Sequence, residues 1–412
     1  MNIFTKGLLG TAAVAAMAGV LAAPAVAQTA PSAAAKVVAS GSDKVKLTVS
    51  GQISREVTMI DDGSETEVKH MDNDYAPSMF RIGGEGKVNS ETKIGTTIEM
   101  MITPNNSSAT SQDVANTNSG GASTHEARVV EIFFANDTFG TVYMGKGSTG
   151  SDGSSELNLS IMGVTQAPMA NSLAFGGALF KAGNDTDTRG LNAVTVAGVL
   201  NEFVGMGRLN RIRYDSPTYF GTQFRATHAD QGDWDTSLWH QSNIAGFDLA
   251  AALAYSQAPN GQDYFGMIDG SVSVMSPWGI GVHGGFGYRD LTAANTTPGE
   301  DPATPFGWSA GVSYETRLIE LGKTGIGYMY QSVSNNAVNG FAGADATSHQ
   351  VAAVQQVDAA ATEIYAAWTN YSLDTTEYFG AGGAYTAGSG SGIQGVGYDD
   401  INVFTLGARV KF

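Results

Sequence analysis

The chain ends in a ten-residue stretch that decides its fold, Val403-Phe404-Thr405-Leu406-Gly407-Ala408-Arg409-Val410-Lys411-Phe412. Its even-numbered residues are all apolar, whereas both cations fall on odd-numbered positions. A period of two indicates a β-strand with one apolar and one polar face. In a bilayer every backbone polar group must be paired, so a membrane-spanning sheet has to join its last strand to its first. A terminal aromatic residue in this register is typical of outer-membrane barrels; the alternative is an ordinary edge strand.

The same period recurs along most of the chain. Apolar residues alternate with polar ones from Leu47 to Met59, from Phe247 to Tyr255 and from Ile280 to Tyr288. Each such segment has about 9 to 11 residues, which is the length of a tilted strand that crosses a bilayer. The pattern predicts an all-β fold, a transmembrane antiparallel β-barrel of about 16 strands, and it leaves 18 strands open.

The expected connections come in two sizes. Tight hairpin turns are predicted at Asn136–Gly140, Asn243–Gly246 and Ser276–Gly279. Outer-membrane barrels have short turns at the periplasmic end and longer loops at the other end. Long polar segments of this second kind are expected at roughly 61–77, 103–126, 291–306 and 334–350.

The composition excludes several classes of protein. The 412 residues include no cysteine, which excludes disulfide scaffolds, thiolate metal sites and cysteine nucleophiles. Lysine plus arginine come to 22 against 39 aspartates and glutamates, and the net charge of −17 argues against nucleic acid as a partner. A charged fraction of 15% and 53 glycines favour sheet and loop over helix.

The first 27 residues are predicted to be a signal peptide. Met1–Lys6 is short and positive, 7–27 carries no charge, and Ala25-Val26-Ala27 has the pattern that signal peptidase recognises. A transmembrane anchor is the alternative. We expect 28–43 to be a flexible lead-in, rich in alanine and serine, and 44–412 to be the barrel domain.

Three short segments carry a resemblance to a known family. Residues 207–221 read GRLNRIRYDSPTYFG, 139–146 read FGTVYMGK and 47–52 read LTVSGQ. The first is similar to the Asn-Arg-Ile-Arg-Tyr-Asp-Ser-Pro strand and turn of the general porins of Gram-negative bacteria, particularly those of alphaproteobacteria. The other two are weaker matches. With the terminal Phe412, the resemblance covers essentially the whole mature chain.

The resemblance implies a location, an assembly and partners. It implies a water-filled barrel of 16 strands in the outer membrane, assembled as a homotrimer, with a third loop that folds inward and narrows the pore. The implied partners are outer-membrane lipid and lipopolysaccharide, the barrel-assembly machinery during biogenesis, and small hydrophilic solutes and ions. Residues 148–205 are the candidate constriction loop. That segment is long and rich in alanine and glycine. The sequence therefore does not predict how wide the pore is.

Alternation also predicts which charged side chains face the lumen. Ile212 and Tyr214 suit lipid, so Arg211 and Arg213 are expected to face water. An arginine facing lipid near the midplane would cost about 2–4 kcal/mol, which favours this orientation. Charged rings set the selectivity of such pores, although each charge could instead be a solvated rim residue. The candidate pore-lining residues are Arg81, Lys87, Lys146, Arg211, Arg213 and Arg225, opposed by Asp152, Glu156, Asp185 and Asp187 of the candidate loop.

Two cations do not fit this pattern. Arg55 falls on the apolar face of its strand, and Lys146 shares a face with Val142 and Met144. A bulge, a subunit contact or snorkelling at a strand end would explain either of them.

No cofactor is predicted. Gly140–Gly147 is one residue short of a phosphate-binding loop, and Asp185–Gly190 departs from a calcium loop at Arg189. The histidines show no zinc spacing. A calcium ion bound by loop aspartates stays open as a hypothesis, with Asp61, Asp62, Asp72 and Asp74 as its ligands.

The expected function is that of an outer-membrane porin for passive diffusion of ions and small hydrophilic solutes, without catalytic residues. The surplus of acidic residues favours a mild cation preference. The alternatives are a substrate-specific channel, for sugars for example, an outer-membrane protease or phospholipase, and a secreted soluble β-protein.

Overall fold

The computed structural model describes most of the chain after the predicted lead-in. The predicted signal peptide lies outside it, as do Asp185 and Asp187. The described residues are 36–38, 41, 44–113, 124–181, 194–200, 203–258, 266–290, 304–338, 341–378, 393–394 and 397–412.

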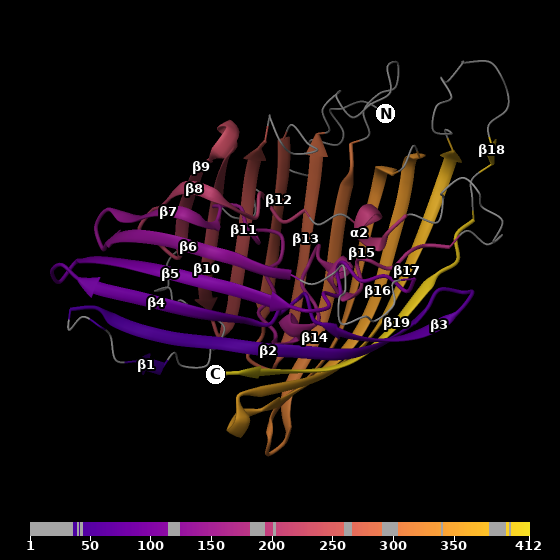
Figure 1. Ribbon diagram of the computed structural model, residues 1–412, viewed down its shortest axis with the longest axis horizontal. Coiled ribbons are helices and arrows are strands. Elements are labelled where there is room, and N and C mark those ends of the chain that lie inside the picture. Colours follow the sequence, from indigo (N-terminus) through magenta and orange to yellow (C-terminus); the bar gives the residue numbers. More distant parts are fainter. Residues whose placement is uncertain are drawn as a thin grey trace.

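The described strands form a single antiparallel sheet of 19 members, of which 16 make a closed ring. The prediction of about 16 strands is confirmed. Figure 1 shows the ring running in chain order from indigo to yellow. Its strands are β2 (Lys46–Asp61), β4 (Met79–Lys87), β5 (Thr92–Thr103), β6 (Thr124–Asn136), β7 (Gly140–Ser148), β8 (Arg208–Asp215), β9 (Thr222–Ala229), β10 (Trp234–Ile244), β11 (Phe247–Gln257), β12 (Gly266–Met275), β13 (Ile280–Asp290), β14 (Phe306–Ile319), β15 (Gly322–Val338), β16 (Phe341–Val357), β17 (Thr362–Tyr378) and β19 (Ile401–Lys411).

The ring closes between its last strand and its first. β19 pairs with β2 from Asn402 opposite Asp61 to Lys411 opposite Gln52. The chain end continues the pairing, because the Phe412 N–H donates to the Gly51 carbonyl (3.0 Å) and the Gly51 N–H donates to the Phe412 carbonyl (2.8 Å). The alternating last strand therefore has the closing role that its sequence predicts, and Figure 1 shows β2 beside β19.

Three short strands extend the sheet. β1 (Lys36–Val38) and β3 (Thr66–Asp72) both pair with β2, and β3 and β4 follow one another along the same edge of β2. β18 (Ile393–Gln394) pairs with the end of β17, whose remaining length pairs with β19. No helix in the described part of the chain is long and apolar enough to span a membrane.

Two of the expected long loops instead contain strand residues. β3 lies within 61–77, so β2 turns back after Asp61, and 334–350 is taken up by the ends of β15 and β16. Both segments are polar, and their polarity caused the error. A strand that extends beyond the bilayer is wet on both faces and loses its period of two. The three tight turns lie between β6 and β7, β10 and β11, and β12 and β13, as expected.

The two faces of the sheet differ as the alternation predicts. On β19, Phe404, Leu406 and Val410 are exposed on the outside, whereas Ile401 and Val403 are buried inside the ring. The exposed apolar side chains of the other strands form the matching outer surface, which suits the acyl chains of a bilayer.

The chain between β7 and β8, residues 149–207, is called the inner loop below, and the parts of it that the structure describes lie inside the ring. Its described parts are 149–181, 194–200 and 203–207. It contains the short helices η2 (Ile161–Val164), η3 (Asn171–Ala174) and α2 (Val196–Val199), and Figure 1 shows α2 against β15 and β16.

Candidate functional site

The inner loop is held to the wall of the barrel by polar side chains that point inward. Asp235 of β10 accepts hydrogen bonds from the Ser151 N–H (3.0 Å), the Ser151 hydroxyl (2.6 Å) and the Gly150 N–H (3.2 Å). On β12, Asp269 accepts from the Ser154 hydroxyl. Since a buried carboxylate is costly unless it is hydrogen-bonded, these contacts fix the start of the loop against the wall.

The same arrangement continues around the ring. Side chains of β12, β14 and β15 accept hydrogen bonds from the backbone of the loop, so the loop follows the wall from β10 to β15. The pairs are Leu157 N with Ser271 Oγ (3.1 Å), Leu159 N with Ser273 Oγ (3.0 Å), Ile161 N with Glu315 Oε2 (2.9 Å), Met169 N with Ser309 Oγ (3.1 Å) and Asn171 N with Gln331 Oε1 (3.0 Å).

An apolar core lies between the inner loop and the wall. Phe175, Phe180 and Phe203 of the loop are fully buried and pack with Val333 of β15 and Leu373 of β17. These wall positions face inward, where the alternation predicts polar side chains. The loop therefore covers an apolar part of the wall, and this part of the ring is filled with side chains rather than water.

Glycines of the wall make room for the loop. A Cβ atom at Gly287 of β13 would overlap the Phe203 ring, and one at Gly307 of β14 would collide with Phe203 and Met169. Only a residue without a side chain allows the loop this close an approach.

The wall from β4 to β9 carries three groups of charged side chains. Glu99 of β5 is buried between two arginines: Arg81 of β4 donates to it from Nε (2.8 Å), and the Arg128 Nε lies 3.1 Å away. The Arg81 side chain is 53% exposed and the Arg128 side chain 16%. Arg81 therefore presents its charge to the water inside the ring.

Arg211 has a different environment. Its side chain is 1% exposed, it pairs with Glu131 of β6, and it donates to the carbonyls of Ser148 (2.9 Å) and Gly145 (3.2 Å). Arg211 points inward as expected, but it is buried and holds the start of the inner loop rather than lining water.

A third charged group combines arginines with aromatic rings. Asp215 of β8 pairs with Arg213 (2.8 Å) and lies 3.7 Å from Arg225 of β9. The Arg213 guanidinium lies 4.4 Å from the centre of the Tyr143 ring, and the Arg225 guanidinium lies 4.3 Å from that of Trp239. Cation–π contacts of this kind hold both guanidinium groups in place.

The acids of the inner loop do not face the arginines as a group. Asp152 pairs with Arg208 at 3.3 Å, whereas Glu156 is half-buried further along the loop, where its N–H donates to the Gly153 carbonyl (3.1 Å). The inward arginines take their partners mainly from neighbouring strands. Alternation along one strand does not show such partners, which is why Glu99, Glu131 and Asp215 were missed.

Two of the candidate cations lie on strands of this wall but outside its three charged groups. Lys87 is the exposed last residue of β4, next to a short turn. Lys146 lies on the outer face of β7, where it pairs with Glu126 at 2.7 Å, so its assignment to the lumen is corrected. Arg55 likewise lies on the outer face and pairs with Asp72 at 2.6 Å.

The four aspartates of the calcium hypothesis do not come together as ligands. Asp72 pairs with Arg55, and Asp61 accepts from the Gly63 N–H (3.1 Å). The described residues contain no group of three histidines or acids that could hold a metal ion.

Asp62 instead belongs to a junction between loops. Gln112 donates to Asp62 (3.0 Å) and to the Leu179 carbonyl (2.6 Å), and it accepts from the Leu179 N–H (2.8 Å). Burial alone would raise the pKa of Asp62. The N–H groups of Glu65 and Ser64, the Ser64 hydroxyl and the Gln112 amide lower it below its usual 3.8. Lys181 adds an ion pair with Asp113 (2.8 Å).

The wall side chains that hold the inner loop follow a pattern that is visible in the sequence. Inward positions read Asp-x-Ser at 235–237 and Asp-x-Ser-x-Ser at 269–273. Short polar side chains repeated at every second residue are typical of a wall that binds backbone rather than water alone.

Comparison with solved structures agrees with this architecture. OmpT, an outer membrane protein of Vibrio cholerae, matches with a TM-score of 0.54 and 12% identity over 92% of this chain and 100% of that one. An anion-selective porin from Comamonas acidovorans gives 0.55 and 14% over 89% and 100%. OmpF of Salmonella typhi gives 0.52 and 14% over 90% and 98%. At these identities the likeness concerns the fold.

The sequence comparisons identify the family. Among curated proteins no sequence matches this chain. The model of the family described as Gram-negative porin matches residues 11–376, which is most of the chain. The closed ring, the loop inside it and this match together assign the chain to the Gram-negative porins, channels of the outer membrane for passive diffusion.

Proposed function

We propose that ions and small hydrophilic solutes cross this barrel along an off-centre path beside β4–β9. The supporting observation is the apolar core that fills the space between the inner loop and strands such as β15 and β17. Water inside the ring would then lie beside the arginines of β4–β9. Aperture and charge at that wall would then decide which solutes pass.

We further propose that the path prefers anions. The three charged groups of this wall comprise five arginines (81, 128, 211, 213 and 225) and three carboxylates (99, 131 and 215), so 5 − 3 gives a local charge of +2, and the Glu85–Lys93 pair on the same strands adds nothing to it. The Arg208–Asp152 pair adds nothing to that sum. The acidic surplus of the whole chain favours cations, but charges beyond a Debye length of about 8 Å are screened, so those near the path count most.

The test is a measurement of single channels of the purified protein in a planar bilayer. A salt gradient should give a reversal potential of the sign that anion permeation produces. A cation-selective channel would contradict the proposed preference, and a protein that inserts without conducting would contradict the path.

We propose a channel role rather than catalysis because the chain belongs to a porin family. A sugar-specific channel is the alternative. Tyr143 and Trp239 are the aromatic rings placed to stack on a sugar, but arginines already lie over both. A concentration-dependent block of the current by a sugar would favour that alternative.

We propose a homotrimer as the assembly. One solved structure of the similar V. cholerae protein is a trimer form. In this chain Arg55 and Lys146 lie on the outer face of the sheet, where a charge facing lipid costs about 2–4 kcal/mol at the midplane. A subunit contact would remove that cost. The mass of the detergent-solubilised protein, measured by light scattering, tests the trimer.

The remaining partners follow from the location in the outer membrane. We propose contacts with lipid and lipopolysaccharide on the outer surface and with the barrel-assembly machinery during insertion. We also propose that residues 1–27 are removed on export, that 28–43 is a lead-in and that the barrel domain covers 44–412. An intact mass equal to that of a chain beginning at Gln28 would support the cleavage site, and the mass of a chain beginning at Met1 would contradict it.

A further inference from the structure

A groove lies on the outer face of the barrel, over the last strands and the seam between β19 and β2. Its volume is about 550 Å³, which is within the range of about 300–1,000 Å³ that small-molecule sites have. Apart from Thr405, the residues that line it are apolar. They are Val57, Met59, Val68, Ile326, Val351, Ala352, Ala353, Ala366, Ala367, Trp368, Phe404, Thr405 and Leu406.

Two alanines make the floor of this groove. Ala353 of β16 and Ala366 of β17 are paired directly across the two strands, and both are exposed on the outer face. Larger side chains stand on either side, because Ile326 of β15 is paired with Ala353 and Leu406 of β19 with Ala366. The short alanine side chains between these larger neighbours therefore leave a depression in the surface.

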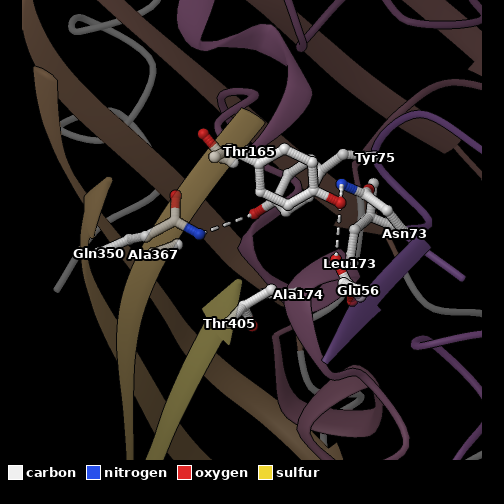
Figure 2. Close-up of a pocket in the computed structure, with 10 residues that line it drawn as sticks. Glu56, Asn73, Tyr75, Thr165, Leu173, Ala174, Gln350, Ala367 and Thr405 are labelled. Carbon is white, nitrogen blue, oxygen red and sulfur yellow. Dashed lines mark hydrogen bonds between the residues drawn. The ribbon is translucent and has the colours of Figure 1, made fainter. Parts of the chain in front are cut away.

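The inner side of the same strands has a different character. Figure 2 shows Gln350, Ala367 and Thr405 beside a small polar cavity of about 10 Å³ behind the inner loop. Since side chains alternate along a strand, the groove and this cavity lie on opposite faces of the sheet. The groove is continuous with the exposed apolar surface that faces acyl chains in an outer-membrane barrel. An acyl chain is therefore the occupant that suits its lining.

Polar side chains cross the outer face directly beyond the groove. The outer positions of β19 are apolar from Val410 to Phe404, and the next outer position is Asn402. The ladder places Asn370 beside Asn402 and His349 beside Asn370, and all three side chains are half-buried. These residues mark the border of the apolar band at the end of the barrel opposite the short turns, where lipid headgroups begin.

Hydrogen bonds connect these polar side chains to the groove. The Trp368 indole N–H and the Asn370 amide both donate to Asn402 Oδ1, each at 3.2 Å. The Tyr328 hydroxyl lies 2.8 Å from His349 Nδ1. Because Trp368 also lines the groove, a lipid with its chain in the groove would bring its headgroup to this network.

The charge at this border favours a headgroup without phosphate. A polar row is formed by Tyr330, His349, Asn370, Asn402 and Asp61, in the order in which the ladders join them. None of these five described residues is a lysine or an arginine, which are the side chains that bind phosphate, and the Asp61 carboxylate would repel one. The Tyr330 and His349 rings lie 4.9 Å apart beside the two amides. Amide groups next to rings suit the hydroxyl groups of a sugar.

We propose that the groove and the polar row together bind a lipid with a sugar headgroup. An acyl chain would lie over Ala353 and Ala366, and the sugar would contact the amides of Asn370 and Asn402. This inference rests on the contact with lipid proposed above, and it adds the place of that contact and the headgroup. The lipid would cover the seam between β19 and β2 from outside, away from the path of the solutes.

The test uses two detergents with the same alkyl chain and different headgroups, dodecyl maltoside and dodecylphosphocholine. The purified protein is exchanged into each, and the molecules that stay bound are counted by native mass spectrometry. We expect a retained maltoside on each wild-type chain and no retained phosphocholine. Ala366→Phe places a ring in the floor of the groove, so this variant should lose the maltoside. Because Ala366 is exposed on the outer face, the ring leaves the packing inside the barrel unchanged.

Ala226→Phe is the matched control, because Ala226 lies on the outer face of β9, away from the groove, and this variant should keep the maltoside. Asn370→Leu leaves the groove open but removes an amide of the polar row, so it should retain less maltoside than the wild type.

No bound maltoside on the wild type, or unchanged retention by Ala366→Phe or Asn370→Leu, would overturn the proposal. Equal retention of the two detergents would also overturn it, while the general contact with lipid would still stand. A smaller assembly of Ala366→Phe in light scattering would show that a neighbouring copy occupies the groove, which again contradicts the lipid. None of these readouts depends on conduction, so the site and the proposed path are tested separately.

Discussion

Arg81 and Arg211 carry the same charge and point to the same side of the sheet, but only Arg81 presents it to water. Arg211 is enclosed by Glu131 and by backbone carbonyls, whereas half of the Arg81 side chain is exposed. At the scale of single residues, exposure decides whether a charge acts on a solute or on the fold. A buried charge that is paired with a neighbouring residue acts on that residue and not on a passing solute.

Arg81→Ala should therefore shift the selectivity of the channel toward cations. A unit charge about 8 Å from an ion in water contributes about 0.5 kcal/mol, which corresponds to roughly a twofold change in the permeability ratio. Reversal potentials in a salt gradient measure it. Lys146→Ala removes the same charge from the outer face and serves as the control. An equal shift in both variants would show that the inward position of Arg81 is not the cause.

Asp62 should make the loop junction sensitive to acid. Its pKa is lowered on folding, so its contribution to stability is present above the unfolded value and is lost as the pH falls through the folded one, below 3.8. The unfolding temperature of Asp62→Asn should lie below that of the wild type at neutral pH, and the difference should disappear in acid of that strength. Asp61→Asn is the control. A difference that does not change with pH would argue against a role for the carboxylate.

For single residues, the sequence predicts the direction of a side chain but not its burial or its partners. Alternation predicted the side of Arg81, Arg213 and Arg225, because side-chain direction is a local property of a strand. It did not predict burial or partners. Arg211 is buried against the end of β7, about 60 residues earlier in the chain, and Lys146 pairs with Glu126 of another strand.

At the scale of elements, the inner loop behaves as a packed layer and not as a hinged flap. Asp235, Ser271 and Glu315 accept its backbone N–H groups from three different strands, and Phe203 fits against Gly287. Its place after β7 matches the segment expected from the resemblance. Its apolar underside could not be expected, since inward Val333 and Leu373 break the alternation of polar and apolar faces and only the loop itself explains them.

Asp235→Ala should loosen the start of the inner loop. The Ser151 N–H and hydroxyl would lose their acceptor inside the barrel, at a cost of about 1–3 kcal/mol. We expect a lower unfolding temperature and larger current fluctuations in single-channel recordings, because the loop borders the path. Asp248→Ala, which removes a carboxylate that bonds Asn243 in a short turn, should leave the current noise unchanged. Quiet wild-type-like currents from Asp235→Ala would contradict the role of the anchors.

In the whole molecule, each strand of the ring is hydrogen-bonded to a strand on both sides. Every strand of the ring pairs with its neighbours in chain order, and the seam between β19 and β2 is bonded like the other junctions. The pattern of alternation predicted this closure and the number of strands. The extra length of β15 and β16 escaped prediction because nothing apolar marks a strand in water.

A circular permutant should test the equivalence of the junctions. Joining Phe412 to Lys46 through a short linker and opening the chain at the Ala245–Gly246 turn keeps every strand pairing of the ring. We expect the permutant, refolded from urea into detergent, to regain the strand content and conductance of the native order. A permutant opened inside β12 breaks the ladders to β11 and β13 and should not refold. If the first permutant also failed to refold, β19 and β2 would have to be chain ends.

The seam between β19 and β2 has a consequence for the order in which the chain is synthesised and folds. β2 is synthesised well before β19, yet each is the other's neighbour in the sheet. Until β19 has been made, the first edge of the sheet therefore has no partner strand, and a chain truncated before β19 would leave two open edges. Closure of the ring thus has to wait until nearly all of its strands have been synthesised.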